Sequence, residues 1–366
     1  MRTAVRAALV VSIVLAASIR IPAQTVRRYL YVAVPSSGAA VSATERSVRF
    51  LVFDVARSHR FVRSIPLWTI ERGDDAEMVR GTAVNDRTGR LFVSTTKRLA
   101  SIDLKTDAIV WQQDYGGRCC DRFALSADGK TIYAPAFGRA QWYVVDAESG
   151  RLRHTIVVTG WPRETKFSRD GRSVYLAAWE SPVLSVADTA TNEVTRTVGP
   201  FSASLCPFTV NGKGTLAFAN VDGLVGFEVG DLQTGLILDR VAADGSSDDG
   251  SGRDASQSAA AYECPSHGIA FTPDERELWI ADGVTNSLRV FDASVYPPVP
   301  RTSVKLTAQP RWIAFSGDGR YAYVSTGDVI SPATKRIAGT LEDGSGVKVS
   351  SENFLEVEIA DGHPNR

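Results

Sequence analysis

The sequence has few of the residues that build metal and nucleic-acid sites. Its 366 residues include four histidines, four cysteines and two methionines, and 41 basic side chains balance 41 acidic ones. Because the basic residues are scattered and the net charge is zero, no nucleic-acid partner is expected. The cysteine and histidine spacings match no zinc pattern, and no phosphate loop or Ser-His-Asp order occurs. We therefore predict no metal and no cofactor.

Long apolar runs are also absent, except at the N-terminus. Arg2 and Arg6 precede an apolar run from Ala7 to Ile19, which ends shortly before the polar Gln24. This is the layout of a cleavable secretory signal, and the run is shorter than the roughly 20 residues that a membrane-spanning helix needs. We expect a signal peptide at 1–23 and no membrane span after its cleavage. The mature protein is expected to be periplasmic or extracellular.

The main feature of the sequence is a polar turn that recurs along the chain. In its clearest copy, Phe315 to Gly319, an apolar strand end leads into Ser-Gly-Asp-Gly and then into a second apolar strand. Its glycine, or the residue in the glycine place, steps by 40, 42, 43 and 61 residues through Gly89, Gly129, Gly171, Gly214 and Glu275. A fixed period of about 40 residues is typical of repeat units that share one core. One domain over 24–366 is therefore expected.

The strand that follows this turn can be counted. Seven copies, rich in β-branched and aromatic residues, lie at 30–32, 91–93, 132–134, 174–176, 216–218, 278–280 and 321–324. Each is followed by a third strand that usually closes on an aspartate turn, and then by a fourth strand. Four short antiparallel strands per repeat form one propeller blade. The predicted fold class is all-β, a seven-bladed β-propeller of four-stranded antiparallel blades.

The two ends of the chain are predicted to close the ring. The first repeat lacks its inner strand, whereas Phe354 to Ile359 is an alternating strand left over after the seventh repeat. Pairing this C-terminal strand into the first blade removes the exposed sheet edges of an open array. About 20 extra residues enter before the sixth blade, at 244–262, and with the long loop from Pro35 to Ser47 they mark one face, called the top face, as the elaborated one. We expect the insertion to be a lid over that face.

The repeats resemble the YVTN-type β-propeller repeat over essentially all of the mature chain. The resemblance lies in the small inner strand, the Ser-x-Asp-Gly turn and a strand such as Tyr321 to Val324; the segment from Gly327 to Ile337 is similar to the Val-Ile-Asp-x-Ala-Thr part, with Ser331 in the aspartate place. Proteins of this YncE-like and lactonase-like superfamily include exported proteins of unknown role, lactonase-like enzymes and propellers of quinone-dependent catabolism. The resemblance implies the fold and leaves the activity open.

A candidate site follows from aligning the residues that enter each inner strand from the top. One equivalent position, five residues ahead of the turn's Ser, Thr or Asn, holds Arg80, Asp121, Arg163, Cys206, His267 and Arg311. The next position includes Arg122, Glu164 and Trp312. Guanidinium groups match carboxylates and phosphates by paired hydrogen bonds, so this ring suits a small anionic ligand. The alternative is that the arginines pair with Asp121, Glu164 and Glu180.

Three further sets of residues complete the expectations. His267 is a candidate ligand contact or general base, with Glu164 and Asp121 as carboxylates that it could work with. Tryptophans near the top face stack on a ligand or pack between blades; they are Trp161, Trp179 and Trp312. The preferred disulfide joins Cys206 and Cys264, which enter adjacent inner strands, and leaves Cys119 and Cys120 as a vicinal pair or free thiols.

The leading interpretation is an exported, monomeric binding or scaffold propeller with a small anionic ligand or a protein partner at the top face. One alternative is a lactonase-like or lyase-type enzyme acting on a small anionic or sugar-derived substrate. Another is an accessory protein of a periplasmic quinone-dependent oxidation pathway.

Overall fold

The structure is a computed structural model that describes residues 26–36, 47–70, 77–116, 119–243, 264–360 and 363–365. The expected signal peptide at 1–23 and the expected insertion at 244–262 lie outside the described residues. In the described part, no helix is long and apolar enough to cross a membrane.

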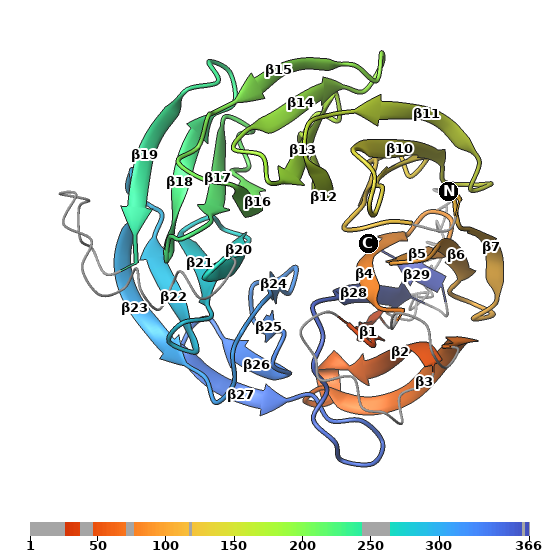
Figure 1. The fold of residues 1–366 in the computed structure, drawn as a ribbon. Coiled ribbons are helices and arrows are strands. Elements are labelled where there is room, and N and C mark those ends of the chain that lie inside the picture. The colour runs from red at the N-terminus through yellow and green to blue at the C-terminus, as the bar shows by residue number, and fades with distance from the viewer. Residues whose placement is uncertain are drawn as a thin grey trace, which may run out of the picture.

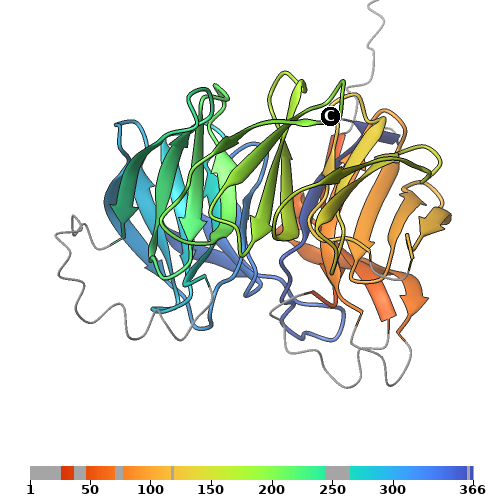
Figure 2. The same ribbon diagram turned by 45° about the horizontal axis from the view of Figure 1, so that its top comes forward.

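Seven antiparallel sheets are arranged in a ring (Figure 1). In every sheet except the one that contains β1, the first strand along the chain lies toward the central axis and the last at the rim. The all-β, seven-bladed fold predicted from the repeats is confirmed. Seen from the side, the sheets stand next to one another like blades (Figure 2).

Blade 1 is built from both chain ends, in the order β29 (His363–Asn365), β28 (Phe354–Ala360), β1 (Val26–Val34), β2 (Ser47–Asp54) and β3 (Arg60–Thr69), with a short 3-10 turn η1 (Val55–Arg57). Blade 2 contains β4 (Val79–Asn85), β5 (Arg90–Thr95), β6 (Leu99–Asp103) and β7 (Ile109–Gln113). Blade 3 contains β8 (Ala124–Leu125), β9 (Thr131–Pro135), β10 (Gln141–Asp146) and β11 (Leu152–Val157).

Blade 4 contains β12 (Trp161–Phe167), β13 (Ser173–Trp179), β14 (Leu184–Asp188) and β15 (Val194–Val198). Blade 5 contains β16 (Leu205–Val210), β17 (Leu216–Val221), β18 (Gly226–Asp231) and β19 (Ile237–Ala242). Blade 6 contains β20 (Ser266–Phe271), β21 (Glu277–Asp282), β22 (Ser287–Asp292) and β23 (Val299–Lys305). Blade 7 contains β24 (Ile313–Phe315), β25 (Ala322–Val324), β26 (Asp328–Ser331) and β27 (Arg336–Thr340).

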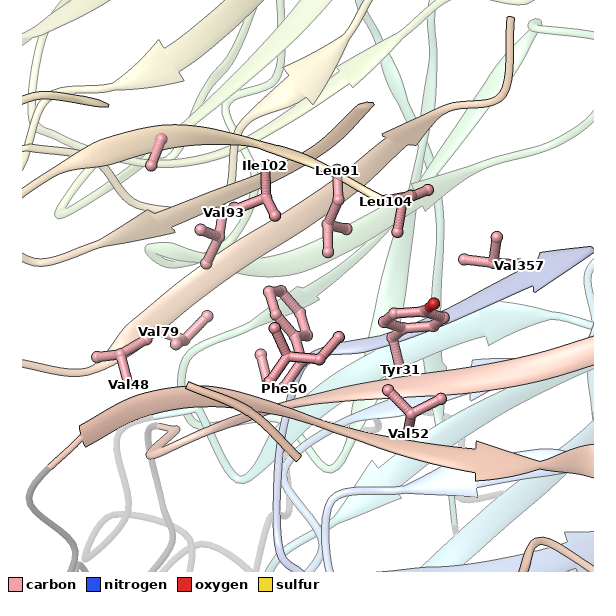
Figure 3. Close-up of a cluster of buried hydrophobic side chains, with 13 residues drawn as sticks. Tyr31, Val48, Phe50, Val52, Val79, Leu91, Val93, Ile102, Leu104 and Val357 are labelled. Atoms are coloured by element: carbon pink, nitrogen blue, oxygen red, sulfur yellow. The ribbon is translucent and has the colours of Figure 1, made fainter. Parts of the chain in front are cut away.

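The hydrophobic core lies between the blades. Successive side chains of a strand point to opposite faces of its sheet, so an uninterrupted apolar strand can serve two interfaces. Tyr31 of β1 and Phe50 of β2 pack against Leu91 of blade 2, as Figure 3 shows. Leu30 and its neighbours pack on the other side, against Tyr323 of blade 7. The apolar second strands counted in the sequence are continuous for this reason.

The recurring turn is held by its own side chains. In blade 3, the Ser126 hydroxyl donates to Asp128 at 2.6 Å and accepts from the Thr131 amide at 2.9 Å. The residue in the glycine place has a positive φ, 71° at Gly129 and 56° at Glu275, a region that glycine enters without strain. Glu275 therefore fills the same turn position as the glycines, as the spacing indicated.

The ring is closed by the pairing of β28 with β1, in register from Val26 opposite Ala360 to Val32 opposite Phe354. This confirms that the C-terminal strand completes the first blade. The blade differs from the prediction in one respect, because β29 adds a fifth strand that pairs with β28 from Glu358 to Ala360. The sheet of blade 1 thus has an extra strand next to β28, on the side away from β1.

Two disulfides join the four cysteines. Cys206 and Cys264, which enter blades 5 and 6, have α carbons 5.7 Å apart. Cys119 and Cys120 form a vicinal disulfide directly before the start of blade 3, and both are fully buried.

Candidate functional site

The aligned residues from the sequence lie at the same end of their blades. Arg80, Arg163 and His267 occupy the second or third position of inner strands β4, β12 and β20, and Arg311 lies two residues before β24. Because every inner strand runs in the same direction along the axis, these side chains meet at one mouth of the ring. The sequence alignment therefore located a real cluster.

The first contacts of this cluster link blades 2 and 3. Arg80 donates from Nε and Nη2 to the two carboxylate oxygens of Asp121, at 3.2 and 2.8 Å. The backbone amide of Arg122 also donates to Asp121. Burial raises the pKa of this carboxyl group, but Arg80, Arg122 and Arg163 outweigh that effect and hold the pKa below its usual value. Asp121 is therefore a buried anion at neutral pH.

The second group of contacts crosses the ring. The Arg122 guanidinium of blade 3 donates to Glu352, which precedes the closing strand of blade 1, and its carbon lies 4.1 Å from the ring centre of Trp312 in blade 7. The other oxygen of Glu352 accepts from Nε of Arg311 at 2.9 Å. Glu352 is 3% exposed. One buried carboxylate thus serves two arginines from blades 3 and 7.

His267 supports Arg311. Its Nδ1 lies 2.8 Å from the carbonyl oxygen of Arg311, and its Nε2 lies 3.4 Å from Nη2 of the same arginine. Because a carbonyl accepts only, Nδ1 carries the proton and Nε2 is the acceptor. Burial, together with Arg122 and Arg311, lowers the pKa of His267 well below its usual value. The imidazole is neutral, and both nitrogens are used in positioning Arg311.

Arg163 differs from the other arginines. Its Nε is buried and has no hydrogen-bond partner among the described residues, and no ion pair of the described residues includes it. The guanidinium carbon lies 5.0 Å from the ring centre of Trp179 in the same blade. Burial lowers the pKa of Arg163, Arg122 and Arg80 lower it further, and Asp121 opposes them. An arginine side chain nevertheless stays protonated, so Arg163 is a charge that interacts with Asp121 at a distance and forms no ion pair among the described residues.

These seven residues are called the mouth cluster below: Arg80, Asp121, Arg122, Arg163, His267, Arg311 and Glu352. A cavity of about 160 Å³ borders part of it. Its lining includes Arg80, Arg122, Trp312 and Glu352, together with side chains one to three positions beyond the aligned residues, such as Lys166. Arg163 and Arg311 are not part of this lining.

The remaining predicted residues lie outside the mouth cluster or beside it. Glu164 accepts from the Phe208 amide at 3.2 Å and pairs with Lys166 at 3.1 Å, so it joins blades 4 and 5 and does not neutralise the arginines. Glu180 is exposed in the turn after β13. Cys206 is engaged in its disulfide, and Trp161 is 46% exposed.

Glu352 is the residue that the sequence analysis missed. Counting back seven residues from the turn aspartate gives Asp121, Arg163, His267 and Arg311, but from Asp361 it gives Phe354. Glu352 lies two residues before that position, in a segment that Ser351 and Asn353 fix by hydrogen bonds to the carbonyl oxygens of Ala33 and Val79. The signal in the sequence was an acidic residue just before the C-terminal strand, the one inner strand for which the alignment gave no ring residue.

The described residues contain no group of three or more His, Cys, Asp or Glu placed to hold a metal ion. The chemistry that the cluster offers is recognition of an anion by guanidinium groups stacked on indole rings.

Fold and site together define a seven-bladed β-propeller with an arginine-rich mouth at one end of its axis. A scan against protein-family models finds no match, and no curated protein matches the sequence. Among solved structures, the hydrazine synthase of Kuenenia stuttgartiensis is similar, with a TM-score of 0.62 and 16% identity over 79% of this chain and 90% of that chain. At this identity the likeness shows the fold alone.

Proposed function

We propose that this propeller is a binding protein for a small anion, which it takes up at the mouth cluster. The observation that carries the proposal is Arg163, a half-buried arginine whose Nε atom is buried and has no partner among the described residues. Leaving a buried donor unpaired costs about 1 to 3 kcal/mol, and more when the group is charged. A bound anion removes that cost, so the site favours anionic ligands over neutral ones.

A binding role is favoured over a catalytic one, because the candidate catalytic residues are engaged in structural contacts. Both nitrogens of His267 are held by Arg311, and Glu164 is held by the Phe208 amide and Lys166. The third candidate catalytic residue, Asp121, accepts two hydrogen bonds from Arg80. These groups stabilise the positions of the arginines, which is the task of a recognition site.

We also propose that the protein works outside the cytoplasm. The N-terminal sequence supports export, and two disulfides are typical of proteins in an oxidising compartment. Small anions present in such a compartment are the ligands to screen.

The experiment is a thermal-shift screen of acetate, succinate, phosphate and a neutral sugar, followed by calorimetric titration of each anion that raises the melting temperature. A ligand at 100 times its dissociation constant adds about 2.7 kcal/mol to the free energy of unfolding, which is a shift of a few degrees. We expect at least one anion to bind the parent protein and the neutral sugar to have no effect.

Two variants locate the site. Arg163→Gln is expected to lower the affinity for that anion at least ten-fold. Arg276→Gln removes the same charge from the opposite face, where the Arg276 side chain is 81% exposed, and is expected to bind like the parent. Absence of binding by every anion, or equal loss in both variants, contradicts the proposal.

A further inference from the structure

A vicinal disulfide lies directly before two members of the mouth cluster. Cys119 is bonded to Cys120, and the next two residues are Asp121 and Arg122. Both cysteines are fully buried, and they pack among apolar side chains of blades 2 and 3, including Phe92 of β5. The disulfide is therefore part of the contact between these two blades.

The inner strand of blade 3 starts late. The amide of Asp121 donates to the carbonyl of Pro135 at 2.9 Å, but regular pairing of β8 with β9 begins only at Ala124, three residues further on. In blades 2 and 4, by contrast, Arg80 and Arg163 lie inside β4 and β12, with paired residues on both sides. The backbone before Asp121 thus lacks the strand pairing that holds the equivalent residues of these blades.

The contacts of the mouth cluster converge on the dipeptide after the disulfide. Asp121 accepts from Arg80 and from the amide of Arg122, and its carboxylate lies 4.0 Å from the Arg122 guanidinium. Arg122 in turn pairs with Glu352, and its amide also donates to the Arg163 carbonyl at 3.2 Å. A shift of the backbone at 121–122 therefore disturbs partners in blades 1, 2 and 4 together.

A bond between neighbouring residues does little to the unfolded chain. The stabilisation that a disulfide gives through the unfolded state grows with the number of residues in the loop that it closes. The bond between Cys119 and Cys120 spans a sequence separation of 1, whereas the bond between Cys206 and Cys264 spans 58. The effect of the vicinal bond therefore lies mainly in the folded state, where it restricts the backbone that leads into Asp121.

Building on the function proposed above, we infer that Cys119 and Cys120 are positioning residues of the anion site. Their disulfide, held between blades 2 and 3, takes the place of the missing strand pairing and fixes Asp121 and Arg122 where the mouth cluster needs them. Breaking the bond loosens this dipeptide, weakens the contact of Asp121 with Arg80 and lowers the affinity for the anion.

The first test is a double-mutant cycle that needs no ligand. Urea unfolding is measured for the parent, Arg80→Gln, Cys119→Ala/Cys120→Ala and the combination of these changes. Independent changes add in their effects on the free energy of unfolding, and coupled changes do not. We expect the loss caused by Arg80→Gln to be at least halved when the disulfide is absent. Lys335→Gln breaks an ion pair with Glu277 at the opposite face, 2.7 Å long, and should cost the same with or without the disulfide.

The second test is calorimetric titration of the same proteins with acetate, succinate and phosphate. For a probe that binds the parent, Cys119→Ala/Cys120→Ala is expected to lower the affinity at least ten-fold, and Lys335→Gln less than two-fold. The single variants Cys119→Ala and Cys120→Ala break the bond but keep one sulfur in the core, so they should match the double variant in both tests. A role in packing alone predicts instead that each single variant keeps part of the affinity.

The outcomes distinguish the inference from the function. A probe that binds the parent and the disulfide-free variants equally overturns the inference and leaves the function intact. Additive effects in the cycle overturn the inference as well, whatever the affinities. Coupling to Arg80 while no probe binds the parent contradicts the function and leaves the cysteines as positioning residues of the mouth cluster alone. If none of the disulfide-free variants folds, the pair is structural and the inference is wrong.

Discussion

Replacing Arg163 by methionine is expected to stabilise the ligand-free protein while it abolishes anion binding. Methionine keeps an unbranched side chain against Trp179 but removes the unpaired Nε donor and the charge. Binding sites often contain groups that destabilise the ligand-free protein. The same change therefore raises the stability and removes the binding.

The magnitude follows from three contributions. Removing a buried donor without a partner gains about 1 to 3 kcal/mol. Losing the contact between the guanidinium and the Trp179 ring costs about 0.5 to 2 kcal/mol. A methionine sulfur against the same ring returns about 0.3 to 1.5 kcal/mol. We expect a net gain of about 1 to 2 kcal/mol in the free energy of unfolding.

The assay is equilibrium unfolding in urea, in a chloride buffer without carboxylate or phosphate. A rise in the midpoint at an unchanged slope is the expected result. Adding the anion found by the screen should reverse the order, because only the parent gains the binding free energy. If Arg163→Met instead loses more than about 1 kcal/mol without ligand, Arg163 is a structural residue and the proposed anion site is wrong.

Two further predictions concern the blade contacts. His59 is buried with its Nε2 3.2 Å from the Tyr323 hydroxyl, and burial lowers its pKa to about 4. The folded state therefore binds this proton less readily than the unfolded state. The contribution of neutral His59 to the free energy of unfolding is fully present above pH 6.5, and about 1 to 3 kcal/mol is lost as the pH drops from 6.5 to about 4. Urea midpoints of His59→Gln should lack this part of the pH dependence, and parallel curves for the two proteins disprove it. Replacing Cys206 and Cys264 together by serine opens a link across 58 residues and should cost about 2 to 4 kcal/mol in the same assay, whereas an unchanged midpoint shows that the bridge does not constrain the chain.

The propeller was predictable because its information is local. A turn such as Ser126 to Thr131 is held by bonds among its own residues, and the apolar strands follow each other at a fixed period. Strand closure was predictable because the first repeat lacked a strand that the C-terminus could supply. The extra strand β29 has only a few residues and no apolar alternation, so no sequence pattern indicates it.

The mouth cluster was predictable in its positions but not in its pairings. The ring position follows from the repeat spacing, yet Arg122 and Glu352 are 230 residues apart and meet only because one side chain crosses the ring. The sequence offered Glu164 and Glu180 as partners for the arginines. In the structure Glu164, in the middle of β12, instead accepts a hydrogen bond from the Phe208 amide of blade 5. Which arginine lacks an ion pair therefore depends on long-range contacts between blades.

The position of Glu352 connects the closure of the ring to the assembly of the site. Its backbone amide donates to the Ser36 hydroxyl at 2.9 Å, and the next residue, Asn353, donates from Nδ2 to that hydroxyl and to the carbonyl of Val79. The Ser351 hydroxyl donates to the Ala33 carbonyl at 2.7 Å. The segment that brings in the closing strand is therefore fixed to blades 1 and 2 on both sides of Glu352.

This arrangement has a consequence for when the site exists. Until the C-terminal strand is paired, Arg122 and Arg311 lack the one carboxylate that they share, and charge repulsion among the arginines disfavours their approach. Once Glu352 is in place, its buried charge requires both partners, since removing one partner from a buried pair costs about 3 to 5 kcal/mol. Ring closure and the assembly of the mouth cluster are thus coupled. Under the proposed function, a propeller with an undocked C-terminus should lose anion binding even though every arginine of the mouth cluster is still present.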